Sequence, residues 1–114
     1  MTSGAQAEQT AARYLQQQGL QLVESNYRCR FGEIDLILRD GKILVFAEVR
    51  MRSSGDFGGA AASIDSRKQA KLIRAAQSYL ANISNIPACR FDAVLLKSAE
   101  GLEDIEWVKN AFEL

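Results

Sequence analysis

The sequence predicts an α/β domain with a mixed β-sheet of four to five strands, flanked by helices. Apolar side chains first recur at helical spacing and then alternate as in strands, and this order of helix and strands occurs twice. The second helix is long enough to act as a crossover that returns the chain parallel to an earlier strand. A chain of 114 residues fits one domain, so we expect residues 1–114 to share one core.

The first expected element is a helix over Gly4–Gln18, which Gly19 ends. The apolar side of this helix is formed by Ala11, Ala12, Tyr14 and Leu15. A short strand within Leu20–Tyr27 follows. Two longer strands, over Glu33–Arg39 and Lys42–Arg50, then follow. The dipeptide Asp40-Gly41 between them favours a tight hairpin turn.

Residues 51–63 are rich in glycine, serine and alanine and are expected to form a loop. Asp65 or Ser66 then caps a second helix that runs to about Ile83. The helical stripe of this segment consists of Leu72, Ile73, Ala76, Tyr79, Leu80 and Ile83. Beyond Pro87, the segments Arg90–Lys97 and Leu102–Val108 complete the strands of the sheet.

The composition is that of an ordinary globular protein, with 47% hydrophobic and 25% charged residues, but it contains no histidine. The absence excludes Ser-His-Asp triads, Cys-His nucleophiles, histidine-ligated zinc and histidine general bases. A bound metal would therefore need oxygen ligands, which favours Mg²⁺ or Mn²⁺. The net charge is zero, yet residues 28–74 hold ten basic and six acidic side chains, an excess that permits a basic patch.

The two cysteines, Cys29 and Cys89, form no Cys-x-x-Cys motif, and we interpret them as free thiols in a reducing compartment. No apolar run approaches the roughly 20 residues of a membrane span. Residues 1–6 show neither the basic nor the apolar region of an export signal. These features predict a cytoplasmic protein that does not enter a membrane.

Four carboxylate and guanidinium side chains of the hairpin are candidates for chemistry. If Asp40 and Gly41 are the two turn residues, the numbers of paired residues sum to 81, and Glu33 lies opposite Glu48. Because side chains alternate along a strand, Glu33, Asp35, Glu48 and Arg50 would share one face with Ile37, and Ile34 would take the other. Crowded carboxylates are costly unless a cation or protons join them. A solvated acidic face, paired with nearby arginines, is the simpler alternative.

Glu8 lies on the apolar side of the first helix, where a carboxylate needs a partner. A salt bridge to a core arginine and a third metal ligand are the two explanations we consider. The second helix carries Arg67, Lys68, Lys71 and Arg74. Such a stripe is usually a solvated face, but beside a metal site it could follow a nucleic-acid backbone. Asp92 is most simply a partner for a neighbouring arginine.

Two runs carry a family resemblance, namely GEIDLI at residues 32–37 and VFAEVR at residues 45–50. They resemble the YraN family of small bacterial proteins, described as Holliday-junction-resolvase-like and placed in the PD-(D/E)XK nuclease superfamily. The match extends over nearly the whole chain. It includes Glu8, Lys68 and residues 26–28, 57–58, 90–92 and 110–112.

The resemblance implies a restriction-endonuclease-like core in which Asp35 and Glu48 are metal ligands. The third motif position, normally a lysine thought to position or deprotonate the attacking water, falls on Arg50. Arginine keeps the positive charge but does not readily release a proton at neutral pH. It can still stabilise charge in a transition state.

Our working hypothesis is an endonuclease that uses Mg²⁺ or Mn²⁺ and acts on DNA, branched DNA included. The expected catalytic residues are Asp35, Glu48 and Arg50; the expected metal ligands are Glu8, Glu33, Asp35 and Glu48; and the expected nucleic-acid contacts are Arg52, Arg67, Lys68 and Lys71. A junction has two-fold symmetry, which would suit a homodimer, although no residue compels one. The alternatives are a non-catalytic nucleic-acid-binding module with the nuclease fold and a protein-interaction domain with a structural acidic face.

Overall fold

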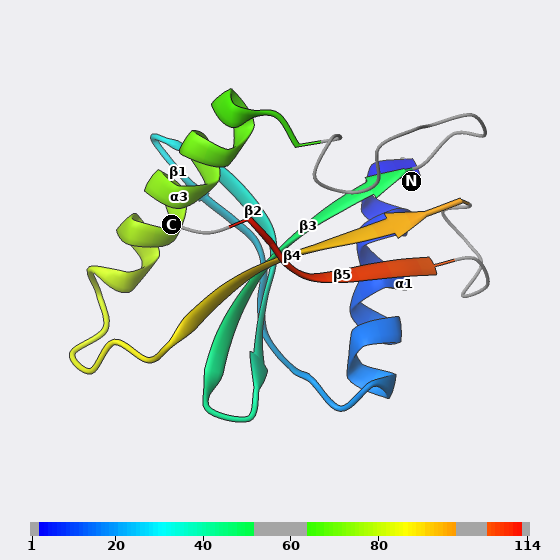
Figure 1. Ribbon diagram of the computed structural model, residues 1–114, viewed down its shortest axis with the longest axis horizontal. Helices are drawn as coiled ribbons and strands as arrows, with labels where there is room; N and C mark the ends of the chain where they lie inside the picture. Colours follow the sequence, from blue (N-terminus) through cyan, green and yellow to red (C-terminus); the bar gives the residue numbers. More distant parts are fainter. Residues whose placement is uncertain (1–2, 52–63, 98–104, 113–114) are drawn as a thin grey trace.

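The computed structural model describes residues 3–51, 64–97 and 105–112 and shows an α/β fold (Figure 1). Its elements in chain order are α1 (Ser3–Gln17), β1 (Gln21–Cys29), β2 (Gly32–Asp40), β3 (Ile43–Met51), α3 (Ser66–Leu80), β4 (Cys89–Leu96) and β5 (Ile105–Phe112). The strands form one five-stranded sheet in the order β1-β2-β3-β4-β5. The expected loop over residues 51–63 lies almost wholly outside the described residues.

The sheet is mixed, as the sequence predicted. Neighbouring strands are antiparallel except β3 and β4, which run parallel from the Leu44↔Cys89 pair to the Met51↔Leu96 pair. The parallel pair follows from α3, which carries the chain back along the sheet before β4 begins. Asp65 caps α3, because its Oδ1 accepts a hydrogen bond of 2.8 Å from the backbone N–H of Lys68.

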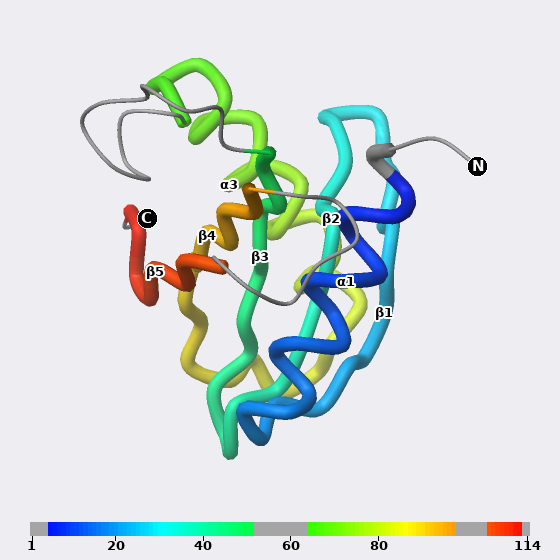
Figure 2. Tube along the Cα trace, turned by 90° about the vertical axis from the view of Figure 1, so that its right-hand side faces the viewer, coloured from blue at the N-terminus to red at the C-terminus, as the bar shows by residue number. Residues whose placement is uncertain are grey.

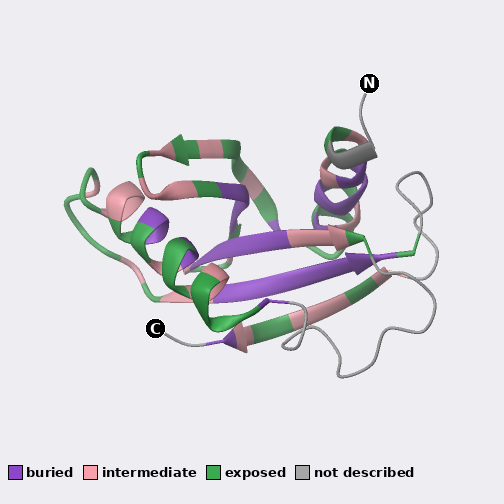
Figure 3. Cartoon of the chain, turned by 90° about the horizontal axis from the view of Figure 1, so that it is seen from above, coloured by how far each residue is buried: buried purple, intermediate pink, exposed green. Residues whose placement is uncertain are grey.

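Two hydrophobic clusters cover the two faces of the sheet. On one face, α1 packs on a cluster that includes Leu36 and Leu38 of β2. On the other face, α3 packs on a cluster that includes Ile34 and Ile37 of the same strand. The central strands β3 and β4 are buried over most of their length (Figure 3). The core is therefore two-sided, which explains why these two strands carry near-continuous apolar runs.

The expected hairpin register was wrong by one turn position. The numbers of paired residues in β2 and β3 sum to 83, because Asp40 pairs with Ile43 and the turn residues are Gly41 and Lys42. Gly41 has a φ of 63° and occupies the first central position, where the type II′ hairpin turn places glycine. Sequence reasoning had put this glycine in the second position. The correction moves every pairing by two residues.

The expected alternation of β2 side chains is also wrong at one point. Ile34 packs with Ile37 on the α3 side, although an unbroken strand would put Ile34 with Leu36. The irregularity falls at Asp35, which lies between Ile34 and Leu36. Such a break in alternation changes the direction in which a side chain points, here that of Asp35, relative to the rest of its strand.

Asp92 anchors the far half of the sheet and is fully buried. As expected, it pairs with an arginine: the Nε of Arg90 donates to Oδ1 at 2.8 Å and a terminal nitrogen donates to Oδ2 at 2.9 Å. It also accepts from Trp107 Nε1 at 2.9 Å and from the backbone N–H of Asn110 at 3.0 Å, both on β5. Arg90 in turn reaches Asp40, 3.0 Å away beside the hairpin turn. One carboxylate thus ties β5 and the hairpin turn to β4.

Both cysteines are free thiols and are partly buried, in agreement with the sequence-based expectation. Among the described residues, no helix combines the length and the apolar character that crossing a membrane requires. Helix α1 ends at Gln17, one residue before the expected Gln18, and α3 ends at Leu80, before the expected Ile83. Shifts of one to a few residues are typical of helix termini.

Candidate functional site

The candidate site lies where the sheet forks. Pairing between β2 and β3 runs from the hairpin turn to Leu36↔Ala47, after which β2 continues to pair with β1 and β3 continues to pair with β4. Figure 1 shows the β1–β2 hairpin and β3 diverging beyond this point. Asp35 and Glu48 are the next residues on the two strands. Both are 7% exposed, so the fork holds two buried carboxylates.

Asp35 is held by the backbone of the opposite strand. The N–H of Val49 donates a hydrogen bond of 2.8 Å to Asp35 Oδ2. A side-chain oxygen therefore replaces the strand partner that Val49 loses at the fork, which satisfies a backbone donor and fixes the carboxylate. Side-chain hydrogen bonding to Asp35 and its negative charge also raise the pKa of Glu8 on one side and of Glu48 on the other, so Asp35 connects the two glutamates.

Glu48 has a pKa raised to about 8, first by burial and then by the hydrogen bond and the negative charge of Asp35. The positive charges of Lys68 and Arg50 act in the opposite direction. Lys68 Nζ, from the first turn of α3, lies 3.4 Å from Glu48 Oε2. The contact is an ion pair without hydrogen-bond geometry, and Oε2 is a buried oxygen that receives no hydrogen bond from the described residues.

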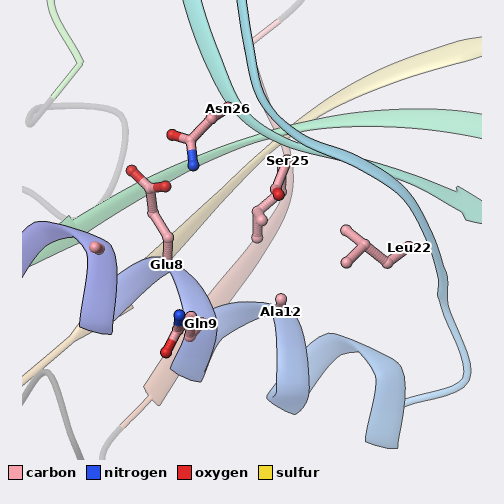
Figure 4. Close-up of a pocket in the computed structure, with 8 residues that line it drawn as sticks. Glu8, Gln9, Ala12, Leu22, Ser25 and Asn26 are labelled. Carbon is pink, nitrogen blue, oxygen red and sulfur yellow. The ribbon is translucent and has the colours of Figure 1, made fainter.

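Glu8 reaches the same carboxylates from α1. Burial and the neighbouring Asp35 raise the pKa of Glu8 to about 7, while a hydrogen bond from the Asn26 amide opposes the rise. Figure 4 shows the Glu8 carboxylate facing Asn26 of β1. The two side chains border a cavity of about 170 Å³ between α1 and the strands, which Leu22 and Leu36 also line.

Glu33 lies at the margin of this carboxylate cluster (Glu8, Asp35 and Glu48). The prediction that it faces Glu48 was wrong, since Glu33 pairs with Arg28 across the β1–β2 hairpin. Its carboxylate forms an ion pair of 3.2 Å with Arg28 Nε, and its side chain is 46% exposed. Its negative charge still contributes to the raised pKa of Glu8.

The basic side chains named from the sequence lie in different surroundings. Lys68 contacts the carboxylate cluster, and half-buried Arg50 acts on it through its charge. Arg67 and Lys71 are exposed on α3. Arg52 lies outside the described residues.

The donor set suits a hard divalent cation, because every candidate ligand is a carboxylate oxygen. The orphaned Oε2 of Glu48 and the two raised pKa values are what crowded carboxylates show when no cation neutralises them. Within residues 3–51, 64–97 and 105–112, however, no three acidic or cysteine side chains converge closely enough to enclose a cation. Water or a substrate phosphate would therefore have to complete the coordination.

Sequence reasoning missed Asn26, whose φ of 55° is left-handed within β1. The signal was present, because asparagine is depleted in strands and tolerates this conformation better than most residues. It also missed that Lys68 touches the cluster. Only its placement in the first turn of a capped helix hinted at that contact.

Comparison with known proteins places the chain in a family. The model of Uncharacterised protein family UPF0102 matches residues 7–96. A UPF0102 protein of Nitrosomonas europaea is 60% identical over 110 residues, covering 96% of this chain and 92% of the relative. A UPF0102 protein of Nitrosospira multiformis is 57% identical over 111 residues, covering 97% and 92%, and one of Psychromonas ingrahamii is 49% identical over 112 residues, covering 98% and 90%. The chain belongs to the UPF0102 family.

Proposed function

We propose that the protein is an endonuclease that requires Mg²⁺ or Mn²⁺ and acts on DNA, with branched DNA among its substrates. The observation that carries the proposal is the fork, where the buried carboxylates of Asp35 and Glu48 meet Glu8 and the ammonium of Lys68. Burying a group of carboxylates costs free energy. Buried ionisable groups with perturbed pKa values are found most often at functional sites.

Asp35 and Glu48 would hold the metal, water or a substrate phosphate would complete its coordination, and Glu8 would assist through its contact with Asp35. Glu33, which is paired with Arg28, would act at most through its charge. A divalent cation supplies an activated water and neutralises charge on the phosphate. The hydrogen bond from Val49 orients Asp35 before any substrate arrives, which lowers the cost of assembling the site.

The cationic part of the reaction would be shared between two side chains. Arg50 stands at the motif position that the superfamily gives to lysine, and its charge reaches Glu48. Lys68 touches Glu48 from the other side of the fork. An arginine there stabilises negative charge on a phosphate without serving as a proton carrier, so we assign both side chains to charge stabilisation.

A non-catalytic nucleic-acid-binding module is the second candidate. It is favoured by the lack of a three-ligand group in the described residues and by Arg50 in place of lysine. In this reading the α3 side chains Arg67, Lys68 and Lys71 would hold phosphates, and the carboxylate cluster would be a remnant of an ancestral site.

The deciding experiment is a cleavage assay on linear, flapped and four-way DNA, with Mg²⁺, with Mn²⁺ and with a chelator. We expect metal-dependent cleavage by the parent protein and none by Glu48→Gln. Glu24→Gln is the matched control, because Glu24 is an exposed acid on β1. Binding without cleavage on every substrate would favour the second candidate, and cleavage that persists in both the chelator and Glu48→Gln would refute the assignment of the site.

A further inference from the structure

The two residues that join β1 to β2, Arg30 and Phe31, are unusual for their position. The Cys29↔Gly32 pair closes the hairpin around them, so they form a two-residue turn. Such turns favour glycine, asparagine and aspartate, whose backbones adopt positive φ easily. In the described chain, the non-glycine residues with positive φ are Asn26 and Asn110. Turn chemistry therefore gives no reason for an arginine and an aromatic residue here.

Phe31 does not belong to the core. Phe91 is stacked between Phe46 and Phe112 in the α3-side cluster, with ring centroids 5.5 and 4.7 Å apart. Phe31 packs in neither hydrophobic cluster and is only partly buried. Its companion is the guanidinium of Arg30, whose Cζ lies 4.8 Å from the centre of the ring. The hairpin tip (Arg30 and Phe31) thus presents an aromatic ring and a planar cation together.

The hairpin tip has more basic than acidic side chains around it. The 76% exposed side chain of Arg28 lies on the same hairpin and forms an ion pair with Glu33, and the exposed Arg30 adds a second guanidinium. A methyl group on Gly32 would meet Cβ of Lys71 at 3.9 Å, so the hairpin passes close to one basic residue of α3. A shallow depression of about 280 Å³, lined by Arg28, Cys29, Gly32 and Glu33, opens beside the turn.

The hairpin is braced and is close to the carboxylate cluster. Tyr27 donates a hydrogen bond of 3.1 Å to Ser78 of α3, and its ring meets the Tyr79 ring edge-on at 5.2 Å. The hairpin closes at the same edge of the molecule as the first turn of α3 (Figure 2). Glu33, two residues from Phe31, acts on the pKa of Glu8 through its charge. A ligand bound at the hairpin tip would therefore lie beside the candidate site.

We infer that the hairpin tip is a stacking platform for an unpaired nucleobase. Aromatic rings and guanidinium planes stack on bases, and nearby basic side chains hold the flanking phosphates. A base within a duplex has both faces covered by its neighbours, so the platform selects a base that is unstacked, as at a branch, a flap or a single-stranded end. The inference deepens the proposed function and rests on it for the choice of a nucleic acid as partner.

The test measures binding in a chelator, so that cleavage plays no part. Labelled single-stranded DNA, single-stranded RNA, blunt duplex DNA and flapped DNA are titrated with the parent protein and its variants. Phe31→Ala should weaken binding to the unpaired substrates by roughly 5- to 150-fold, the range of one lost stacking contact, and leave blunt duplex binding nearly unchanged. Phe31→Trp should restore the affinity, and its added fluorescence should be quenched when a base stacks on it.

Arg30→Ala separates charge from stacking. It should weaken binding and lower the slope of log K against log salt by about 0.7 on single strands, whereas Phe31→Ala should leave that slope unchanged. Arg39→Ala, at the other end of the hairpin, and Val23→Ala, an exposed apolar residue on β1, are the matched controls and should bind as the parent does. The RNA and DNA arms identify which strand supplies the base, and preference for either supports the platform.

Two results would overturn the inference. One is an unchanged affinity of Phe31→Ala for every unpaired substrate, which would make the Arg30–Phe31 contact a local feature of the turn. The other is a parent protein that binds no nucleic acid. A parent that binds through the hairpin tip but cuts nothing with metal would leave the platform standing and remove the proposed catalysis, so the two failures are distinguishable.

Discussion

Lys68 Nζ lies 3.4 Å from Glu48 Oε2, and this ion pair joins the first turn of α3 to the fork in the sheet. The lysine lowers the pKa of a carboxyl that burial and Asp35 raise to about 8. Lys68→Met should therefore raise the Glu48 pKa further, because it removes the cation that touches the carboxyl. Carboxyl NMR titration measures the shift directly. Lys71→Met, one turn further along α3, is the control and should leave the Glu48 pKa in place.

The stability of the metal-free protein should fall as pH rises. Glu8 and Glu48 have folded-state pKa values of about 7 and about 8, above the ordinary value of 4.5. Between the ordinary value of 4.5 and about 8, the folded state thus binds more protons than the unfolded state. The stabilisation that these two groups contribute is therefore fully present at low pH and is lost as pH rises through about 8. Urea denaturation across this range should show the decline. Glu48→Gln should flatten its upper part, and an equally steep decline in that variant would contradict the assignment.

Mn²⁺ or Mg²⁺ should stabilise the folded protein, because only the folded chain brings the carboxylates together. Thermal melts with millimolar metal should show a higher Tm, and Asp35→Asn should remove the increase. Metal binding should also release protons, since Glu8 and Glu48 hold them near neutral pH. Calorimetry in two buffers of different ionisation enthalpy counts those protons. Metal binding with no proton release would place the ion away from the carboxylate cluster.

Arg50 variants separate charge from proton transfer. If the proposed cleavage takes place, Arg50→Lys should preserve or raise its rate, since lysine keeps the charge and adds a group that can release a proton more readily. Arg50→Ala should abolish cleavage and leave folding largely intact, because the side chain is only half-buried and belongs to no hydrophobic cluster. Single-turnover kinetics and a urea melt on each variant make the comparison. Full activity in Arg50→Ala would remove this residue from the reaction.

Asp92→Ala should destabilise the protein by about 3–5 kcal/mol, because it leaves the largely buried guanidinium of Arg90, 15% exposed, without its closest carboxylate. The Trp107 indole N–H and the Asn110 backbone N–H lose their acceptor in the same substitution. Asp40→Ala is the control, since its side chain is 35% exposed and forms an ion pair with the same Arg90. Urea denaturation gives both values. Equal losses in the two variants would mean that Asp92 has no special part in the sheet.

Much of the fold could be predicted from local patterns. The two amphipathic helices, the five strands, the β2–β3 hairpin and the parallel return after α3 followed from side-chain periodicity, turn residues and segment length. The turn position did not, because a glycine in Asp40-Gly41 can occupy either central position of a two-residue turn, and packing along the whole hairpin selects one. The break at Asp35 was equally hidden, since alternation rules assume an unbroken strand.

The carboxylate cluster could be predicted only in part. Asp35 and Glu48 stood out as acids within apolar strands, and Glu8 stood out on the apolar side of a helix. The ion pair between Glu48 and Lys68 joins residues on a strand and a helix that a loop separates in the sequence. Such contacts depend on how α3 packs on the sheet, and no local sequence pattern predicts that packing.

The fork makes the length of the β1–β2 hairpin independent of the spacing between Asp35 and Glu48. Beyond it, the β1–β2 hairpin is paired within itself, while the register of β2 and β3 is set on the other side, near Gly41. Residues inserted in pairs at the hairpin tip would lengthen its reach and leave the spacing of Asp35 and Glu48 unchanged. An engineer, or natural selection, could in this way adjust how far the protein extends along a ligand and keep its carboxylates in place.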